Sequence, residues 1–405
     1  MTPARPASPS APAPRRDAAV IALIAAAHFL SHFYILCIPP LFPMMRAELG
    51  LSYAALGAVM TALSAVTAFG QTPIGVWVDR TGAAPWLIGG TALMALGTAG
   101  LGVAPGWVAL LAAAIVSGLG NATIHPCDYA ILAGSIDQRR MGRAFSLHTA
   151  AGYAGFAAAP PLMIALEAWL GWRGALVAVG GAGLPCTVAI AAHAGILRSE
   201  TRRRHEAPPA RRVLGSRPIL LLFAFMTLLA MGASGVQTFM VAALPLIHGV
   251  AVAAAAAALT AWLVASTAGT LAGGWIADRS RNLVAVVAVM MLSCAALVVL
   301  LGVMPMGETL VVVAAAAAGF CLGVVMPSRD LLVRQAAPAG TTGQVFGFVS
   351  AGLPLGGALA PAPMGWLMDL GAPAAVFLAS AALLAGAVLT AGSARAASAE
   401  PVAAE

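Results

Sequence analysis

Twelve apolar segments, each about as long as a bilayer is thick, constrain the fold of this chain more than any other feature. A helix of about twenty apolar residues crosses the hydrocarbon core, and inside that core every backbone polar group must be hydrogen-bonded within the protein. The sequence therefore predicts an all-α membrane protein with twelve transmembrane helices. The segments are residues 18–41, 54–77, 86–103, 107–131, 143–166, 174–196, 218–244, 254–276, 283–303, 309–330, 341–365 and 371–391.

The few charged residues predict the orientation of these helices. They make up only 9% of the 405 residues, against about 25% in soluble domains. If the N-terminus is cytoplasmic, 19 of the 21 basic residues, all of them arginine, fall on the cytoplasmic side, and only Arg46 and Arg173 lie outside. Such a positive-inside bias predicts a multi-pass protein of the inner (plasma) membrane with both termini in the cytoplasm. It also accounts for the net charge of +7, so we expect no nucleic-acid partner.

The longest polar stretch within the chain divides the helices six and six. Residues 197–217 are expected to be a cytoplasmic linker between an N-terminal six-helix bundle, 18–196, and a C-terminal one, 218–391. Residues 1–17, rich in Pro, Ala and Ser, read as a disordered cytoplasmic tail, and 392–405 as a second tail. The first apolar segment is interpreted as a membrane helix and not as a removed signal peptide.

The two halves repeat each other. Gly75-x-x-x-Asp79-Arg80-x-Gly82 follows the second segment, and Gly274-x-x-x-Asp278-Arg279 follows the eighth, with the two aspartates 199 positions apart. Four further residues recur at an offset of 201: Pro126, Gly142, Phe145 and Pro160 match Pro327, Gly343, Phe346 and Pro361. Two six-helix pseudo-repeats around a central cavity are typical of a large class of transporters.

These motifs resemble the major facilitator superfamily, whose signature Gly-x-x-x-Asp-Arg-x-Gly is present from Gly75 to Gly82. More narrowly, the chain resembles the fosmidomycin-resistance branch, through His28, His125-Pro126 and the residues Arg140 to Ser146. The resemblance implies a secondary active transporter that exports a small amphipathic or drug-like molecule in exchange for protons by alternating access. Proton-coupled uptake of a small metabolite on the same fold is the alternative.

Ionisable residues inside apolar segments are functional candidates, because burying charge in lipid is costly. His28 and His32 stand one helical turn apart, and histidine exchanges protons near neutral pH. We predict that they couple transport to protons or bind substrate; structural hydrogen bonding and metal binding are the other interpretations. Spacing supplies no third metal ligand, so we expect no metal site and no cofactor.

His125 and Asp128 are the second pair of candidates for proton coupling. A helix would place them on one face with Asn121. The alternative is a helix–helix clamp, for example between Asp128 and Arg143 or Arg329. His148 shares a helix face with small residues and is either a packing hydrogen bonder or a proton relay.

The remaining candidates line a cavity or form a gate. We expect the substrate cavity to be lined by Tyr34, Gln71, Asn121, Tyr153 and Gln237. A cytoplasmic gate is expected from Gly75, Asp79, Arg80, Gly82, Arg143, Asp278 and Arg279, although the charges could also be ordinary interfacial residues.

The C-terminal half lacks the ionisable residues of the N-terminal half. At the offset of 201, Met326 replaces His125 and Arg329 replaces Asp128. An apolar wall facing a protonatable one suits a small amphipathic substrate carried against protons. Enzyme motifs and a signalling domain are lacking, so the sequence predicts neither an enzyme nor a sensor. We expect the protein to work as a monomer in the lipid bilayer, with a small-molecule substrate and protons as its partners.

Overall fold

The computed structural model describes residues 14–137, 140–199, 214–338 and 342–399, and within these ranges the chain is helical with no strand. The N-terminal half contains α1 (Pro14–Leu36), η1 (Pro39–Leu41), α2 (Phe42–Leu49), α3 (Tyr53–Thr81), α4 (Ala83–Gly102), α5 (Trp107–Ser135), α6 (Met141–Ala192) and η3 (Ala194–Ile196). The C-terminal half contains α8 (Arg217–His248), α9 (Val252–Arg279), α10 (Leu283–Val303), α11 (Glu308–Ala336), α12 (Thr342–Ser350), α13 (Gly352–Leu359), α14 (Pro361–Asp369) and α15 (Pro373–Ala399).

Each of the twelve predicted segments falls on a helix or a group of short helices. Among the described residues, ten helical spans are long and apolar enough to cross a membrane. The longest, α6, bends sharply at Gly171, whose φ of +65° is left-handed, so it accounts for two predicted segments. Another predicted segment, 341–365, is divided among α12, α13 and α14. Pro361, which has no N–H to donate, opens α14. The all-α fold predicted from the sequence is confirmed.

Helices end in glycine at equivalent positions of the two halves, just as the sequence motifs are repeated. Gly50, at φ +63°, ends α2, and Gly249, at φ +67°, ends α8. Both occupy the left-handed conformation that glycine adopts at little cost when it terminates a helix. They lie 199 positions apart, the same spacing as Asp79 and Asp278. The internal repeat is therefore present in the backbone as well as in the sequence.

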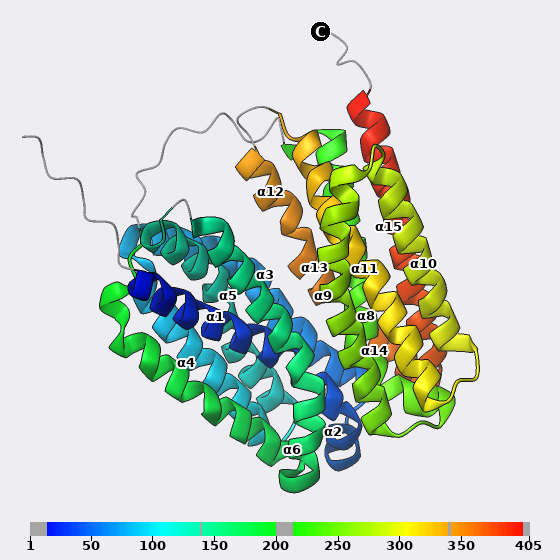
Figure 1. Ribbon diagram of the computed structural model, residues 1–405. Coiled ribbons are helices and arrows are strands. Elements are labelled where there is room, and N and C mark those ends of the chain that lie inside the picture. The colour runs from blue at the N-terminus through cyan, green and yellow to red at the C-terminus, as the bar shows by residue number, and fades with distance from the viewer. Residues whose placement is uncertain (1–13, 138–139, 200–213, 339–341, 400–405) are drawn as a thin grey trace, which may run out of the picture.

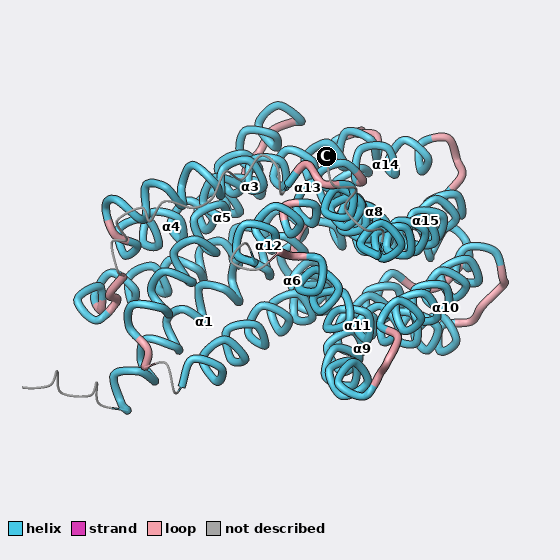
Figure 2. The backbone as a smooth tube through the Cα atoms, turned by 90° about the horizontal axis from the view of Figure 1, so that it is seen from above, coloured by secondary structure: helices cyan, strands magenta, loops and turns pink. Residues whose placement is uncertain are grey.

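The two halves stand side by side and meet at one end of the molecule. In Figure 1 they converge at the bottom, where α2 and α14 lie, and diverge at the top, where α12 and the end of α15 lie. Figure 2, turned by 90°, shows α1, α3, α4 and α5 on one side and α8, α10, α11 and α15 on the other. We call the bottom of Figure 1 the closed end and the top the open end.

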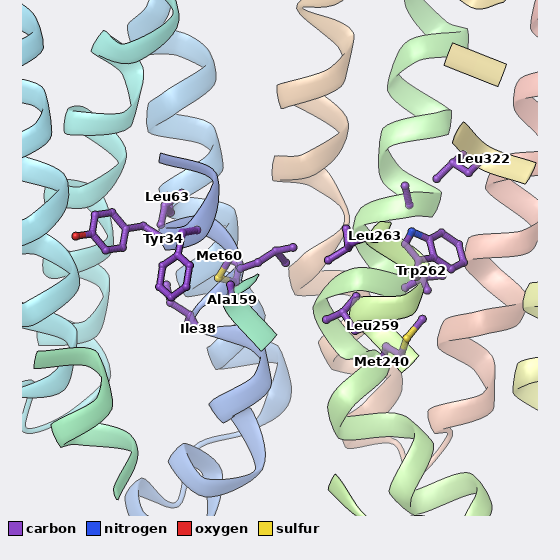
Figure 3. Close-up of a cluster of buried hydrophobic side chains, with 14 of the residues drawn as sticks. Tyr34, Ile38, Met60, Leu63, Ala159, Met240, Leu259, Trp262, Leu263 and Leu322 are labelled. Atoms are coloured by element: carbon purple, nitrogen blue, oxygen red, sulfur yellow. The ribbon is translucent and has the colours of Figure 1, made fainter. Parts of the chain in front are cut away.

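Apolar side chains face one another where the halves approach. Figure 3 shows Met60 and Leu63 of the N-terminal half opposite Leu263 and Leu322 of the C-terminal half. Trp262, fully buried, packs within the C-terminal half behind them. Both halves therefore present apolar surfaces to each other at this level.

Candidate functional site

Five ionisable side chains from three helices form one group inside the N-terminal half. His28 and His32 come from α1, His125 and Asp128 from α5, and His148 from α6. We call these five residues the histidine cluster. Their rings lie close together: the centroid of His28 is 4.3 Å from that of His32, 5.2 Å from that of His125 and 3.7 Å from that of His148. The structure thus brings together all four residues predicted for proton coupling, and adds His148.

Asp128 pairs with His148. Its Oδ2 lies 2.9 Å from Nε2 of His148, and the two side chains are 0% and 2% exposed. The pair joins α5 to α6, as the clamp interpretation expects, but the partner is His148. Arg329 is hydrogen-bonded instead to Asp330 at 3.0 Å. The side chain of Arg143, the other suggested partner, lies outside the described residues. The pair shares a hydrogen bond, so it holds a proton within the membrane-spanning part of the protein.

A second hydrogen bond fixes the orientation of His28. Its Nδ1 lies 2.8 Å from the main-chain oxygen of His148, and the two rings stack at an angle of 5°. A carbonyl oxygen can only accept, so Nδ1 carries the hydrogen and Nε2 of the neutral ring keeps its lone pair. Helix α6 supplies this acceptor because it packs closely on α1. A Cβ at Gly152 would come within 2.9 Å or less of both the His28 and His32 rings.

Three histidines could together hold a metal ion. One ring nitrogen from each of His28, His32 and His125 lies within 4.8 Å of the others, and His28, Asp128 and His148 form a second such group. The sequence spacing could not reveal the first group, because its third member comes from another helix. The sequence does not assign a role to His148 either, because its small neighbours Gly152 and Gly155 are as consistent with helix packing as with function.

A cavity of about 380 Å³ lies between the halves, beside the histidine cluster. Residues of α1, α3 and α6 line one side, and residues of α8, α9, α11 and α13 line the other. Tyr153 and Gln237, both predicted, are among them. Phe156 also lines the cavity, and its ring centroid is 4.2 Å from that of His32. One aromatic ring therefore connects the cavity wall to the histidine cluster.

Three residues predicted for the cavity are not among its lining residues. The buried Tyr34 donates its hydroxyl hydrogen to the carbonyl of Val179 at 3.0 Å, within its own half. Figure 3 shows this hydroxyl pointing away from the C-terminal half. Asn121, also buried, donates to the carbonyl of Ser31 at 3.1 Å, so it joins α5 to α1. Gln71 is partly buried on α3 and does not line the cavity either. The cavity assignments of Tyr34, Asn121 and Gln71 are corrected accordingly.

The residues predicted for the gate lie at the open end. Asp79, Arg80, Asp278 and Arg279 are all exposed. The guanidinium of Arg279 lies 4.1 Å from the centre of the Trp275 ring, within its own helix. Within the described part of the chain, none of the four has an ion pair across the halves. Gly75 and Gly82 lie at the end of α3, and Gly82 has a φ of +88°.

Arg329 places a positive charge on the cavity wall. It lies on α11, lines the cavity, and has a side chain that is 13% exposed. Its hydrogen bond to Asp330 uses Nε, and an arginine offers five donors in all. Arg329 therefore departs from the apolar C-terminal wall that the sequence predicts.

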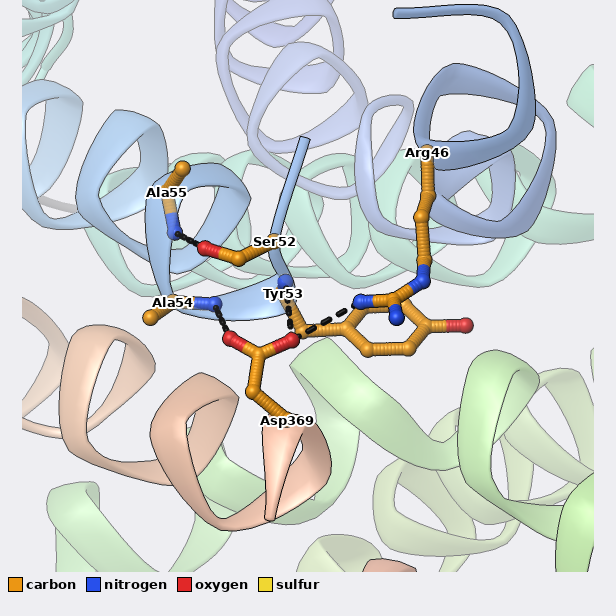
Figure 4. A network of polar contacts seen from close by, with 6 residues as sticks. All are labelled: Arg46, Ser52, Tyr53, Ala54, Ala55 and Asp369. Carbon is orange, nitrogen blue, oxygen red and sulfur yellow. Dashed lines mark hydrogen bonds and ion pairs between the residues drawn. The ribbon is translucent and has the colours of Figure 1, made fainter. Parts of the chain in front are cut away.

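Asp369 joins the two halves at the closed end. Figure 4 shows its carboxylate at the start of α3, with Arg46 beside it. It accepts from the main-chain N–H groups of Tyr53 and Ala54 and from Nη1 of Arg46, each at 2.8 Å. The acceptor belongs to the C-terminal half and all three donors to the N-terminal half. Asp369 thus caps a helix of the opposite half, where the helix dipole favours negative charge.

The chain matches the sequence profile of the Major Facilitator Superfamily over residues 24–304 and again over 223–403. It is 29% identical over 140 residues to a protein of Escherichia coli (strain K12) named "Probable L-galactonate transporter", covering 35% of this chain and 31% of that one. It is 27% identical over 157 residues to the "Uncharacterized MFS-type transporter YfnC" of Bacillus subtilis (strain 168), covering 39% and 38%. Both matches span well under half of the relatives' length.

Solved transporter structures share the fold. A bacterial homolog of the human lysosomal transporter Spinster, in an inward-facing and occupied conformation, superposes with a TM-score of 0.80 at 15% identity, covering 96% of this chain and 97% of that one. A point mutant of the nucleoside transporter NupG gives 0.77 at 14% identity, covering 93% and 99%. The apolar helices, the repeated halves and the family match agree: this chain is a multi-pass membrane protein that belongs to the major facilitator superfamily.

Proposed function

We propose that this transporter exports a small amphipathic, drug-like molecule in exchange for protons, as the fosmidomycin-resistance branch that it resembles does. The observation that carries the proposal is the asymmetry of the site. The histidine cluster lies in the N-terminal half, beside a cavity whose C-terminal wall is mostly apolar. Apolar lining residues suit an amphipathic substrate. Imidazole and carboxyl groups take up and release protons, which is what coupling requires.

We assign proton coupling to His28, His32, His125 and Asp128. The hydrogen bond between Asp128 and His148 supports this assignment, because it places a proton where the bilayer excludes water. The contact between His32 and Phe156 supports communication with the substrate. A substrate that displaces Phe156 would also move the His32 ring, and so alter the surroundings of the proton-carrying groups.

The orientation and the gate follow from the arginines. We propose that the protein lies in the inner membrane as a monomer with both termini in the cytoplasm, because nearly all arginines then fall on the cytoplasmic side. The open end then faces the cytoplasm, and the exposed Asp79, Arg80, Asp278 and Arg279 are a gate that is open in this conformation. In the opposite conformation these charges would pair across the halves, with Gly75, Gly82 and Arg143 shaping the same region.

Proton flux in inverted membrane vesicles tests the coupling. With an acidified vesicle interior, fosmidomycin and a panel of small drugs are added one at a time, and proton release is followed with a pH-sensitive dye. We expect compound-dependent release by the wild type, and its loss in His125→Ala and Asp128→Asn. His193→Ala is the control, since His193 is exposed at the end of α6. Release that survives both cluster variants would exclude coupling through α5, and no response to any compound would count against efflux.

Arg329 favours one alternative, the proton-coupled uptake of a small organic anion. A guanidinium on the cavity wall is the group that binds carboxylates best, and one matched relative is named a probable L-galactonate transporter. If uptake is the function, cells expressing the protein will accumulate labelled sugar acids such as L-galactonate. Arg329→Gln will reduce this accumulation about tenfold or more, because a hydrogen bond from a charged group is lost. Accumulation that is unaffected by Arg329→Gln would remove the reason for this alternative.

A further inference from the structure

We propose that His28, His32 and His125 form a binding site for one divalent transition-metal ion, with Zn²⁺ as the representative ligand. The proposal departs from the expectation of no metal site, which rested on the lack of a third ligand at regular spacing. Helix α5 supplies that third ligand beside the pair on α1. The three side chains need not be near one another in sequence, because the packing of α5 on α1 places them together.

Unpartnered nitrogen atoms are the first evidence for the site. Nε2 of His28, Nδ1 of His32 and Nδ1 of His125 are each buried, and each lacks a hydrogen-bond partner among the described residues. Buried polar atoms in proteins are nearly always satisfied. One ring nitrogen of each residue lies within 4.8 Å of the others. A single cation between the rings would therefore satisfy all three residues at once.

A hydrogen bond behind His28 is the second evidence. A metal-binding histidine almost always donates its other ring N–H to a carbonyl or carboxylate, which fixes the tautomer and directs the lone pair at the metal. His28 does this through Nδ1, to the carbonyl of His148 at 2.8 Å. The His148 side chain in turn bonds Asp128 at 2.9 Å. Asp128 also places a carboxyl group close to the site.

The donor atoms select the class of metal. Imidazole nitrogens suit zinc, copper, nickel and iron, whereas calcium and magnesium prefer oxygen ligands. Three protein nitrogens leave a fourth tetrahedral position for water or another ligand. A Zn–N distance of about 2.1 Å places tetrahedral ligands about 3.4 Å apart, so the rings must draw together by small side-chain rotations when the ion binds. Gly152, which has no side chain, borders the His28 and His32 rings.

The three ligands all belong to the N-terminal half. A bound ion therefore ties α1 to α5 and forms no bridge between the halves. Metal binding follows from this geometry and does not depend on the proposed function. One consequence does rest on that function: an ion that occupies the three lone pairs excludes protons from them, so Zn²⁺ would inhibit proton-coupled transport.

Metal binding by the purified, full-length protein tests the site. The protein is prepared without a polyhistidine tag, stripped with a chelator, and titrated with Zn²⁺ against a chromophoric competitor. We expect one tightly bound ion per chain, and binding weakened at least about a hundredfold in His32→Gln and His125→Gln, since each loses a direct ligand. His193→Gln, at an exposed position, is the matched control and should bind as the wild type does.

A second set of measurements separates ligands from supporting residues. Co²⁺ in place of Zn²⁺ should give the absorption of a tetrahedral nitrogen site in the wild type, and lose it in His125→Gln. Asp128→Asn should keep that absorption, because Asp128 is hydrogen-bonded to His148 and is not one of the three proposed ligands. Size-exclusion profiles and thermal unfolding confirm that each variant folds. The proposal is wrong if the folded wild type binds no Zn²⁺, or binds it equally well after the His32 and His125 substitutions. Either result leaves the transport assay unaffected.

Discussion

A Gly57→Leu substitution is expected to prevent the closed end from closing and to abolish transport. Gly57 lies on α3, where a Cβ would collide with the main-chain carbonyl of Pro361 on α14. The obstacle is backbone, so no change of rotamer can relieve it, and α14 must move away with the rest of the C-terminal half. Buried apolar side chains extend through both halves well beyond this contact, so we expect the variant to fold in the membrane while favouring the conformation that opens at this end.

Distances between spin labels at the closed end measure this effect. Val103 follows the last residue of α4 in the N-terminal half, and Val303 is the last residue of α10 in the C-terminal half. Both lie at the closed end, and they are 70% and 53% exposed. Labels there should move apart in Gly57→Leu, and substrate transport should fall to background. Gly89→Leu is the matched control, since nothing lies within 4 Å of a Cβ at that position on α4. Wild-type distances in the Gly57 variant would show that α14 accommodates a side chain there.

Substituting Asp369 should produce the next largest shift toward opening at the closed end. Asp369→Ala removes the acceptor for two N–H groups of α3 and the partner of Arg46. A hydrogen bond to a charged group contributes about 1.5–3 kcal/mol. The population of the conformation that opens at this end should therefore rise about 10–100-fold. Arg46→Gln should shift it less, because its side chain is 43% exposed and exposed ion pairs contribute about 0–1 kcal/mol.

Asp369 should stop stabilising the closed end only at acidic pH. Burial alone would raise the pKa of Asp369, but the N–H groups of Ala54 and Tyr53 and the Arg46 guanidinium outweigh burial and hold the pKa below its usual value. A lowered pKa in the closed state means that this state is favoured while Asp369 is ionised, and loses the advantage as pH falls through that pKa. We therefore expect constant label distances from about pH 8 to about pH 5, and opening only below about pH 4.

Two variants check this interpretation. In Asp369→Asn the acid-induced opening should disappear, because the side chain no longer titrates. Glu308→Gln is the matched control. Glu308 accepts from the main-chain N–H of Ala251 at 3.0 Å, but both residues lie in the C-terminal half. If Glu308→Gln opened the closed end as far as Asp369→Ala, loss of any carboxylate at a helix end would suffice, and the bridge between the halves would not be the cause.

The fold could be predicted because hydrophobic length and arginine placement are local properties of the sequence. Apolar runs of bilayer length located the long helices, although not the short α2, and the repeat at offsets of 199 and 201 positions indicated two equivalent halves. The division of 341–365 into three short helices was not predicted. Proline and glycine recur in several segments, and which of them interrupts a helix depends on whether neighbouring helices satisfy the freed backbone groups.

The sequence predicts only part of the site, because it does not show which sides of the helices face one another. Spacing along one helix placed His28 with His32, and His125 with Asp128. It could not show that α6 would bring His148 against Asp128, nor that Tyr34 would turn toward Val179. Such contacts depend on the rotation of each helix about its own axis, and a helix that is apolar on nearly every side gives little sign of that rotation.

The aromatic contact between Phe156 and His32 has an evolutionary consequence. The residues that line the cavity and those that we assign to energy coupling are almost entirely different sets, and they meet at this ring. Substitutions on the cavity wall can therefore change which compounds are carried while the coupling residues stay as they are. Under the proposed coupling assignment, new substrates can be acquired by changing one cavity residue at a time without altering a coupling residue.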